Sequence, residues 1–310
     1  MTDRPSILVF AYHNVGFECL GVLARRRENI IAVITHEDDP REEIWFRSVA
    51  DVARQLGIPV YTPVSVNTPE WVERIRAMAP DIIFSFYYRN MISEKILQIP
   101  RLGAFNMHGS LLPKYRGRVP INWAVLHGER ETGVTLHHMV KAADAGDIVD
   151  QEAVLIGPDD TAFDVFTKCT DAARKVLERR LDAIKAGTAP RRKQDEAQAT
   201  YFGGRKPEDG RIDWTQGAER IYDLIRAVTH PYPGAFTEAG GKRLFIWTAK
   251  PLGRGQGKPG TVLSVDPLRV ATGSGSLEIT RYQWEGDHEE AAADVTHDLR
   301  VGMVLGRPKD

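Results

Sequence analysis

Short apolar runs alternate with longer amphipathic stretches through the first two hundred residues, and this pattern constrains the fold more than any other feature. Runs such as ILVFAY and DIIFSF are almost wholly apolar, as strands buried on both faces of a parallel sheet are. The alternation predicts βαβ units, and therefore an α/β fold with a Rossmann-like parallel sheet. We expect strands over 7–12, 30–35, 59–61, 81–86, 104–108, 133–139 and 148–156, and helices over 17–27, 44–56, 69–78, 119–127 and 161–186.

The composition changes after the last of these helices. The segment 188–204 is polar and rich in turn-forming residues, which is typical of an interdomain linker. Beyond it, one helix over 218–228 and several short strands predict a small C-terminal β-barrel of the OB type. We therefore expect two domains, over 1–203 and 204–310. The C-terminal strands are expected over 234–237, 243–248, 260–265, 268–271 and 277–282.

The charge balance argues against a polyanionic partner. The chain carries 41 Lys and Arg against 42 Asp and Glu, and residues 204–310 carry 15 of each kind. Proteins that bind nucleic acids rely on an excess of cationic side chains to neutralise phosphates. We expect no nucleic-acid partner.

Cysteine usage and hydropathy place further limits. Cys19 and Cys169 are far apart and belong to no CxxC or Cys/His cluster, so we expect neither a disulfide framework nor a metal site. No stretch is long and apolar enough to span a membrane, and the N-terminus runs from charged residues directly into a predicted strand. These features predict a cytoplasmic protein without membrane insertion.

The turn after the first predicted strand does not fit a dinucleotide-binding enzyme. It reads AYHNVG and offers only Gly16 where a G-x-G-x-x-G fingerprint would stand. The later glycine-rich segments GGRKPEDG and GRGQGKPG carry no Walker pattern and are interpreted as loops.

A polar pair stands at the end of the predicted strand 104–108. Alternate side chains of a strand share a face, so Asn106 and His108 point the same way. If the strand ends at the carboxyl edge of a parallel sheet, both project into the crevice where such folds bind ligands. An amide N–H can stabilise a developing oxyanion, and an imidazole can move a proton near neutral pH. On these two residues alone, a structural turn or cap is the more common role.

Two further features accompany this pair. The loop 110–117, SLLPKYRG, contains Arg116, whose planar fork suits a carboxylate or phosphate. Asp144, in KAADAGD, could fix and charge an imidazole, or could be a plain turn residue before glycine. The neighbours His137 and His138 point to opposite faces of a strand, so they cannot hold a metal together and are interpreted as structural or peripheral.

The run NMHGSLLPKYRG, followed by Asp144 in MVKAADAGDIV, resembles the folate-dependent formyltransferases that use 10-formyltetrahydrofolate. The resemblance maps the family's catalytic Asn, His and Asp onto Asn106, His108 and Asp144. It makes 1–203 the catalytic domain of an N-formyltransferase. Further similar stretches, among them VFAYHNVG, PDIIFSFYYRNMI, GERETGVTLHHMV and PYPGAF, extend the resemblance over nearly the whole chain.

Within the family, the resemblance is strongest to enzymes that formylate UDP-4-amino-4-deoxy-L-arabinose. In a bifunctional polymyxin-resistance protein this activity belongs to lipid A modification, and a further NAD-dependent decarboxylase domain follows it. With 310 residues, this chain is expected to be a stand-alone formyltransferase. Its expected partners are a UDP-amino sugar and folate, and it could form a homo-oligomer.

The resemblance also implies a site in two halves. Folate is expected on one side, although Asn90 stands where the family pattern has a histidine, and the sugar nucleotide on the other. The residues implied for folate are Asn90, Met91, Ile92, Arg118, Val140, Lys141, Ala142, Ala143 and Asp144, and those for the sugar nucleotide are Tyr12, His13 and Tyr87.

The resemblance implies a mechanism in which a neutral sugar amine attacks the formyl carbon. Asn106 and protonated His108 would stabilise the oxyanion, His108 would move the proton that the leaving folate nitrogen requires, and Asp144 would favour the charged imidazole. Three alternatives remain. The chain could be a methionyl-tRNA formyltransferase, a formyltetrahydrofolate deformylase, or a folate- or nucleotide-binding protein without catalysis.

Overall fold

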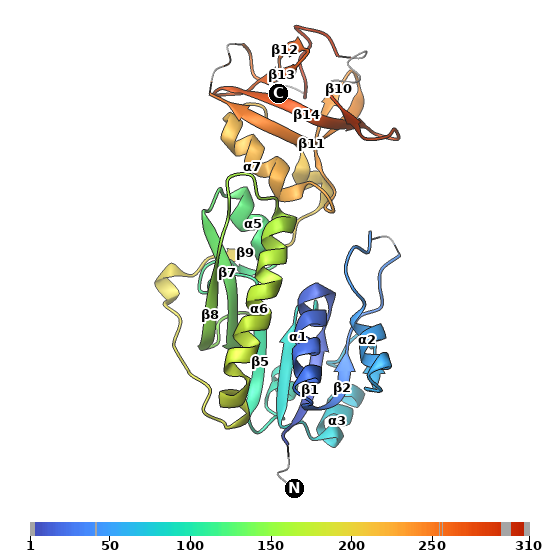
Figure 1. Cartoon of the computed structure of the whole chain (residues 1–310), viewed down its shortest axis with the longest axis vertical. Helices are drawn as coiled ribbons and strands as arrows, with labels where there is room; N and C mark the ends of the chain where they lie inside the picture. Colours follow the sequence, from blue (N-terminus) through green and yellow to red (C-terminus); the bar gives the residue numbers. More distant parts are fainter. Residues whose placement is uncertain (1–3, 41, 254, 256, 293–298, 307–310) are drawn as a thin grey trace. The chain divides into compact units, whose positions relative to one another are not determined.

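A computed structural model describes residues 4–40, 42–253, 255, 257–292 and 299–306 of the chain (Figure 1). Its contacts divide the chain into two compact units. The first comprises Met1–Pro120, Glu131–Leu155 and Phe166–Gly203, and the second comprises Ile121–Arg130, Ile156–Val165 and Gly204–Asp310. In the predicted glycine-rich loop 253–260, Arg254 and Gln256 lie outside the described residues.

The first unit is built on a seven-stranded sheet with the order β3-β2-β1-β4-β5-β7-β8. Its strands are β1 (Ser6–Ala11), β2 (Asn29–Ile34), β3 (Val60–Tyr61), β4 (Ile82–Phe86), β5 (Gly103–His108), β7 (Glu131–His138) and β8 (Ile148–Leu155). The strands from β3 to β5 pair in parallel, whereas β7 and β8 pair antiparallel. The prediction of an α/β fold is confirmed, and the sheet is mostly rather than wholly parallel.

Helices cover both faces of this sheet. They are α1 (His13–Arg25), α2 (Val49–Gln55), α3 (Pro69–Met78), α4 (Glu94–Leu97) and α6 (Ala162–Lys185), whereas α5 (Pro120–Leu126) belongs to the second unit from Ile121 onward. Buried residues of α3 and α4 form a core cluster with Leu8, Phe10 and Ile83 on one face. On the other face α1 and α6 run side by side, joined by ion pairs such as Arg26 with Asp182 (Figure 1).

The largest differences from the predicted helices are two starting residues and one helix that was not predicted. The first helix begins at His13 rather than at residue 17, because the polar start HNVG carries no apolar period that would mark it. The second begins at Val49 rather than at residue 44, because the Ser48 hydroxyl caps it by accepting from the Asp51 N–H. The short α4 was absent from the prediction.

The second unit contains α7 (Ala218–Val228) and a six-stranded sheet that is antiparallel throughout. Its strands are β10 (Ala235–Ala239), β11 (Lys242–Leu252), β12 (Val262–Val265), β13 (Leu268–Ala271), β14 (Ser276–Trp284) and β15 (Glu290–Ala291). The prediction of a C-terminal β domain is confirmed, and by its contacts the unit that contains it also includes Ile121–Arg130 and Ile156–Val165. Two 3₁₀ helices, η1 (Glu196–Gln198) and η2 (Pro207–Gly210), lie in segments predicted as irregular.

Within the ranges that the structure describes, no helix has the length and apolar character needed to cross a membrane. The same residues contain no cluster of three or more His, Cys, Asp or Glu side chains placed to hold a metal ion.

The stacked phenylalanines of the sheet generate the first prediction. Phe84 is fully buried and its ring centroid lies 5.3 Å from that of Phe86 and 5.8 Å from that of Phe105. We expect Phe84→Ala to lower the free energy of unfolding of this unit by about 3–5 kcal/mol, because the cavity cannot close fully. Hydrogen exchange of the β1, β4 and β5 amides measures this unit alone.

The control is Val64→Ala, since that side chain is 97% exposed and should change the unfolding free energy by less than about 0.5 kcal/mol. Equal exchange in the two variants would contradict the assignment of Phe84 to the core.

The two cysteines generate the second prediction. Cys19 and Cys169 are free and fully buried. Burial raises the pKa of the Cys169 thiol to about 12 and that of Cys19 further still. We expect neither thiol of the folded protein to react with a disulfide reagent at pH 8, because the thiolate is the nucleophile. Both should react once the protein is unfolded in guanidinium chloride, and rapid reaction of either in the folded protein would contradict the packing.

Candidate active site

The carboxyl edge of the sheet gathers several of the residues singled out in the sequence. β1 pairs with β2 on one side and with β4 on the other, so the chain connections diverge between β1 and β4. Such a switch point opens a crevice outside the carboxyl ends of the strands, where α/β proteins bind ligands. Tyr12 and His13 follow β1, Tyr87 follows β4, and His108 ends β5.

The three predicted catalytic side chains converge at this edge. Asn106 and His108 share one face of β5, and Asp144 lies in the loop between β7 and β8. The Asp144 Oδ1 atom is 3.5 Å from Nδ2 of Asn106 and 3.4 Å from Nδ1 of His108. His108 is only 6% exposed, whereas Asn106 is half-buried. Asn106 is therefore the more open of the two to a ligand in the crevice.

The proton on His108 is placed by the backbone. Its Nε2 lies 2.8 Å from the carbonyl oxygen of Tyr115, which can only accept, so Nε2–H donates there. The remaining nitrogen, Nδ1, faces the Asp144 carboxylate. The sequence suggested that Asp144 fixes the tautomer of His108, whereas in the structure the Tyr115 carbonyl does so. Nδ1 is then the nitrogen of His108 that can gain or lose a proton.

Asp144 is held as an anion in spite of its burial. Burial disfavours the charged carboxylate, but the imidazoles of His108 and His137 and the Gly117 N–H, which donates to Oδ2 at 3.0 Å, together bring its pKa well below the usual value. Its backbone adopts the left-handed region at φ 54°, which is uncommon for a residue other than glycine. A strained backbone at a buried carboxylate is typical of a functional site.

His137 is a member of the site that the sequence interpretation missed. It lies directly across from Asn106 in the antiparallel pairing of β5 with β7. Its Nδ1–H donates to the His138 carbonyl at 2.9 Å, which leaves Nε2 facing Asn106 Nδ2 at 3.2 Å and Asp144 Oδ1 at 3.5 Å. Nε2 is thus within reach of both the Asn106 amide and the Asp144 carboxylate. Knowledge that β5 and β7 are neighbours would have been needed to find this contact.

His138 points to the opposite face, as predicted. Its ring lies 4.8 Å from that of Phe105, and Nε2 lies 3.0 Å from the Pro190 carbonyl. Its role is structural.

Arg116 corrects a prediction. The sequence suggested a guanidinium fork available for a carboxylate or phosphate ligand. In the structure Arg116 is fully buried, and its fork is filled by Gln194 and Glu196 at 2.7–3.1 Å and by the Tyr201 hydroxyl. The arginine therefore binds another segment of its own chain and has no donor left for a ligand.

The residues expected to contact folate border one face of the sheet. Ala104 belongs to the core cluster covered by α3 and α4, so Asn106 and His108, two and four residues on, lie on that same face. Asn90 and Met91 are exposed there, whereas Ile92 is buried in the cluster and its side chain is closed to a ligand.

The second group expected at folate comes from the loop after β7 and from the neighbourhood of Gly117. Met139 packs against the same core cluster as Ile92. The next four residues, Val140, Lys141, Ala142 and Ala143, are exposed, as is Arg118. These side chains are therefore free to contact a ligand, and Asp144 ends the loop beside His108.

The residues expected at the sugar nucleotide lie among aromatic rings. His13 packs against Trp45, Phe46 and Phe166 with ring centroids 4.1–4.8 Å apart. Burial, assisted by the positive charge of Arg89, lowers the pKa of His13 to about 3, so the ring is neutral. Its Nδ1 is buried without a hydrogen-bond partner among the described residues.

Two tyrosines flank this histidine. The Tyr12 hydroxyl donates to Asp38 at 2.7 Å, and its ring is buried. Tyr87 has φ 57°, and its hydroxyl lies so close to Gly109 that a Cβ at that position would come within 2.2 Å of it. A larger residue directly after His108 would force the Tyr87 ring to shift, and Tyr87 lies at the catalytic edge.

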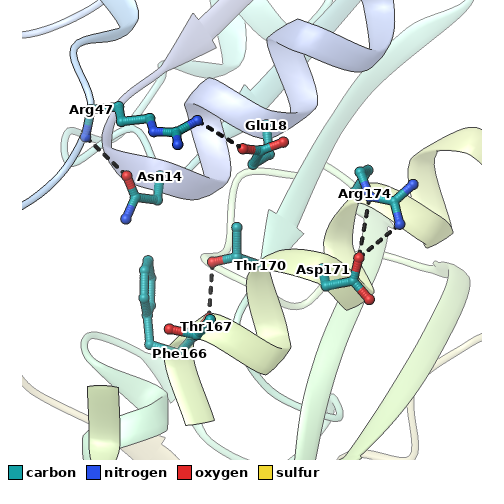
Figure 2. A pocket seen from close by; sticks show the side chains of 8 residues that line it. All are labelled: Asn14, Glu18, Arg47, Phe166, Thr167, Thr170, Asp171 and Arg174. Carbon is teal, nitrogen blue, oxygen red and sulfur yellow. Dashed lines mark hydrogen bonds and ion pairs between the residues drawn. The ribbon is translucent and has the colours of Figure 1, made fainter. Parts of the chain in front are cut away.

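A cavity of about 390 Å³ lies beside this aromatic group (Figure 2). It shares Phe166 with the rings around His13 but includes none of the three catalytic candidates. Its charged side chains are already paired, Arg47 with Glu18 at 3.6 Å and Arg174 with Asp171 at 2.7 Å. The remaining lining residues are Asn14, Thr167 and Thr170.

Solved structures share this fold at low sequence identity. An N-formyltransferase from Helicobacter canadensis, in complex with folinic acid and dTDP-3-aminofucose, is 21% identical with a TM-score of 0.69, covering 89% of this chain and 99% of that one. WlaRD, a sugar 3N-formyl transferase, is 19% identical with a TM-score of 0.69, covering 92% and 100%. HypX from Aquifex aeolicus, in complex with tetrahydrofolic acid, is 19% identical with a TM-score of 0.64, covering 94% and 46%.

Family models match both parts of the sequence. The model described as formyl transferase matches residues 17–181, which is more than half of the chain. The model described as formyl transferase, C-terminal domain, matches residues 205–299. The chain therefore belongs to the formyl transferase family, and it is a formyltransferase with both domains of that family.

Proposed function

We propose that this enzyme transfers a formyl group from 10-formyltetrahydrofolate to the amine of a nucleotide-linked amino sugar. The observation that carries the proposal is the convergence of Asn106, His108 and Asp144 within 3.5 Å contacts at the carboxyl edge of the sheet. An amide donor, an imidazole and a buried carboxylate are the groups that acyl transfer to an amine requires.

The similar structures support the substrate class. The Helicobacter canadensis enzyme was solved with folinic acid and dTDP-3-aminofucose, and HypX with tetrahydrofolic acid. The exposed loop of Val140 to Ala143 and the backbone near Asn90 would hold the folate on the face that carries Asn106. The donor supplies an activated formyl group. The residues of this chain would bind the substrates, stabilise the oxyanion and move the proton.

Each catalytic residue has a task that its contacts suit. The half-buried Asn106 amide would donate to the formyl oxygen as that atom becomes negative, and Asp144, which accepts from the same nitrogen at 3.5 Å, would keep the amide turned for this. His108 would use Nδ1 to move the proton between the amine and the departing folate nitrogen, since Nε2 is committed to the Tyr115 carbonyl. Asp144 would stabilise the imidazolium that forms on the way.

The residues around His13 suit the sugar side. A neutral imidazole can donate to or accept from sugar hydroxyls, but it adds no positive charge for a diphosphate. The Tyr87 hydroxyl lies beside Gly109, directly after His108, and the His13 ring lies 6.5 Å from that of Tyr87. A sugar amine held by these two side chains would therefore be near the catalytic edge.

For the acceptor itself we propose UDP-4-amino-4-deoxy-L-arabinose, formylated at its 4-amino group. The support for this acceptor is the resemblance of the stretches from VFAYHNVG to PYPGAF to enzymes that formylate it. It would place the enzyme in lipid A modification and polymyxin resistance. The dTDP-3-aminofucose bound to the Helicobacter canadensis enzyme indicates alternative acceptors within the same class, namely dTDP-linked 3-amino sugars.

The catalytic assignment generates the third prediction. We expect Asn106→Ala, His108→Ala and Asp144→Ala each to lower kcat about 100-fold or more, because each removes a group that acts in the transition state. Formyl transfer is measured by product mass with 10-formyltetrahydrofolate and the amino sugar.

His288→Ala is the matched control, because this histidine is exposed in the second unit. It should keep the full rate. A folded His108→Ala variant with a near wild-type rate would refute the assignment.

The acceptor generates the fourth prediction. In a panel of UDP- and dTDP-linked 3-amino and 4-amino sugars, we expect the highest kcat/KM with UDP-4-amino-4-deoxy-L-arabinose. Mass spectrometry should show the product heavier by one formyl group, with no formate released in the absence of an amine.

Preference for a dTDP-linked sugar would overturn the specific acceptor and leave the class intact. Formylation of charged initiator tRNA in place of every sugar, or formate release without an amine, would overturn the proposed function.

A further inference from the structure

The segment that follows α6 folds back onto the catalytic edge. We call residues 192–202 the strap. Arg192 exchanges two backbone hydrogen bonds with Ile148 at the start of β8. Farther along, β9 (Tyr201–Phe202) pairs with β6 (Arg116–Gly117). The strap thus joins the two loops that meet at Asp144.

Gln194 lies within the strap, and its side-chain amide makes hydrogen bonds through both its nitrogen and its oxygen. Its Nε2 donates to the carbonyl oxygens of Asp144 and Gly146, each at 2.7 Å. Its Oε1 accepts from Nε and Nη2 of Arg116 at 3.1 and 2.7 Å. An amide offers two N–H donors and two acceptor positions, so the side chain is saturated.

The direction of this amide is locked. Arg116 can only donate and backbone carbonyls can only accept, so a flipped amide would oppose like groups at all four contacts. Arg116 is itself fixed, because it is fully buried and also bound by Glu196. The buried guanidinium therefore aims the Gln194 N–H groups at the Asp144 loop.

The loop that receives these bonds needs an external anchor. Asp144 has φ 54°, and Gly146 passes so close to the end of β7 that a Cβ there would come within 1.8 Å of the His138 carbonyl. The residues before Asp144 are exposed. A left-handed conformation in such a loop persists only where surrounding contacts impose it, and Gln194 binds the carbonyl of the residue concerned.

A second contact of Asp144 depends on the same strap. The Gly117 N–H donates to Oδ2 of Asp144, and Gly117 lies against the Phe202 carbonyl, where a Cβ would come within 2.2 Å. β9 therefore fixes Gly117 by strand pairing, while Gln194 fixes the backbone of Asp144. Together they hold Oδ1 of Asp144 3.4 Å from Nδ1 of His108.

We infer that Gln194 is a positioning residue of this formyltransferase, which acts on the reaction by holding the Asp144 carboxylate against His108. The inference rests on the proposed function, since it needs Asp144 to be catalytic. Gln194 itself touches no reacting atom.

The test compares Gln194→Glu with the wild type. The carboxylate keeps the acceptor for Arg116 and removes both donors to the Asp144 and Gly146 carbonyls. We expect kcat to fall about tenfold or more, as when a group that orients a catalytic residue is lost, with KM for both substrates changed less than about twofold. Hydrogen exchange of the Gly117 amide should become faster, because its acceptor is released.

Gln198→Glu is the matched control. Gln198 lies on the same strap, is exposed, and donates to Asp195. The same chemical change there should leave kcat and the exchange of Gly117 at wild-type values, which shows that added negative charge on the strap is not the cause.

A double-mutant cycle separates positioning from a general loss of structure. In the Asp144→Ala background, we expect Gln194→Glu to lower kcat by less than about twofold, because the group it positions is gone. An equal loss in both backgrounds, or unchanged kcat in Gln194→Glu alone, would overturn the inference. Full activity of Asp144→Ala would instead refute the catalytic assignment on which the inference rests.

Discussion

The buried carboxylate of Asp144 is the interaction on which the site depends. A charge removed from water is stable only where donors and opposite charges replace the solvent. Here the replacements come from separate parts of the chain, namely His108 on β5, His137 on β7 and the Gly117 N–H. Together they keep the carboxylate ionised in spite of its burial. The need to satisfy one charge therefore fixes the relative positions of two strands and two loops.

The antiparallel addition of β7 to a parallel sheet makes this arrangement possible. In the antiparallel pairing, Asn106 lies opposite His137 and His108 opposite Thr135, so polar side chains of both strands share one face at one edge. β7 ends at His138, opposite Phe105, so the loop that follows starts toward the amino end of β5. Asp144 in this loop then reaches the side chains of Asn106 and His108. A short local connection thus places a carboxylate beside an imidazole that lies 36 positions earlier in the chain.

The sequence predicted the strands, and the shared face of Asn106 and His108, better than the surroundings of these residues. Apolar runs and the alternation along β5 were enough to expect the sheet and to place Asn106 and His108 on one face, since these are local properties. The role of His137 depends on which strands are neighbours, and that pairing is not local. Arg116 was misread for a similar reason, because a guanidinium suits an external anion and a glutamine of its own chain equally well until the partner is known.

The strap shows why polarity alone is an ambiguous signal. A polar, turn-rich segment is expected in a linker, yet the same residue types are those that can satisfy a buried arginine and tether a loop. Gln194 and Glu196 direct their polar atoms onto Arg116, and Gln194 also holds the carbonyl of Asp144. The loop after β7 has exposed side chains up to Asp144, so it gains little rigidity from apolar packing. Hydrogen bonds from outside the loop have to supply that rigidity, and only a polar segment can make them.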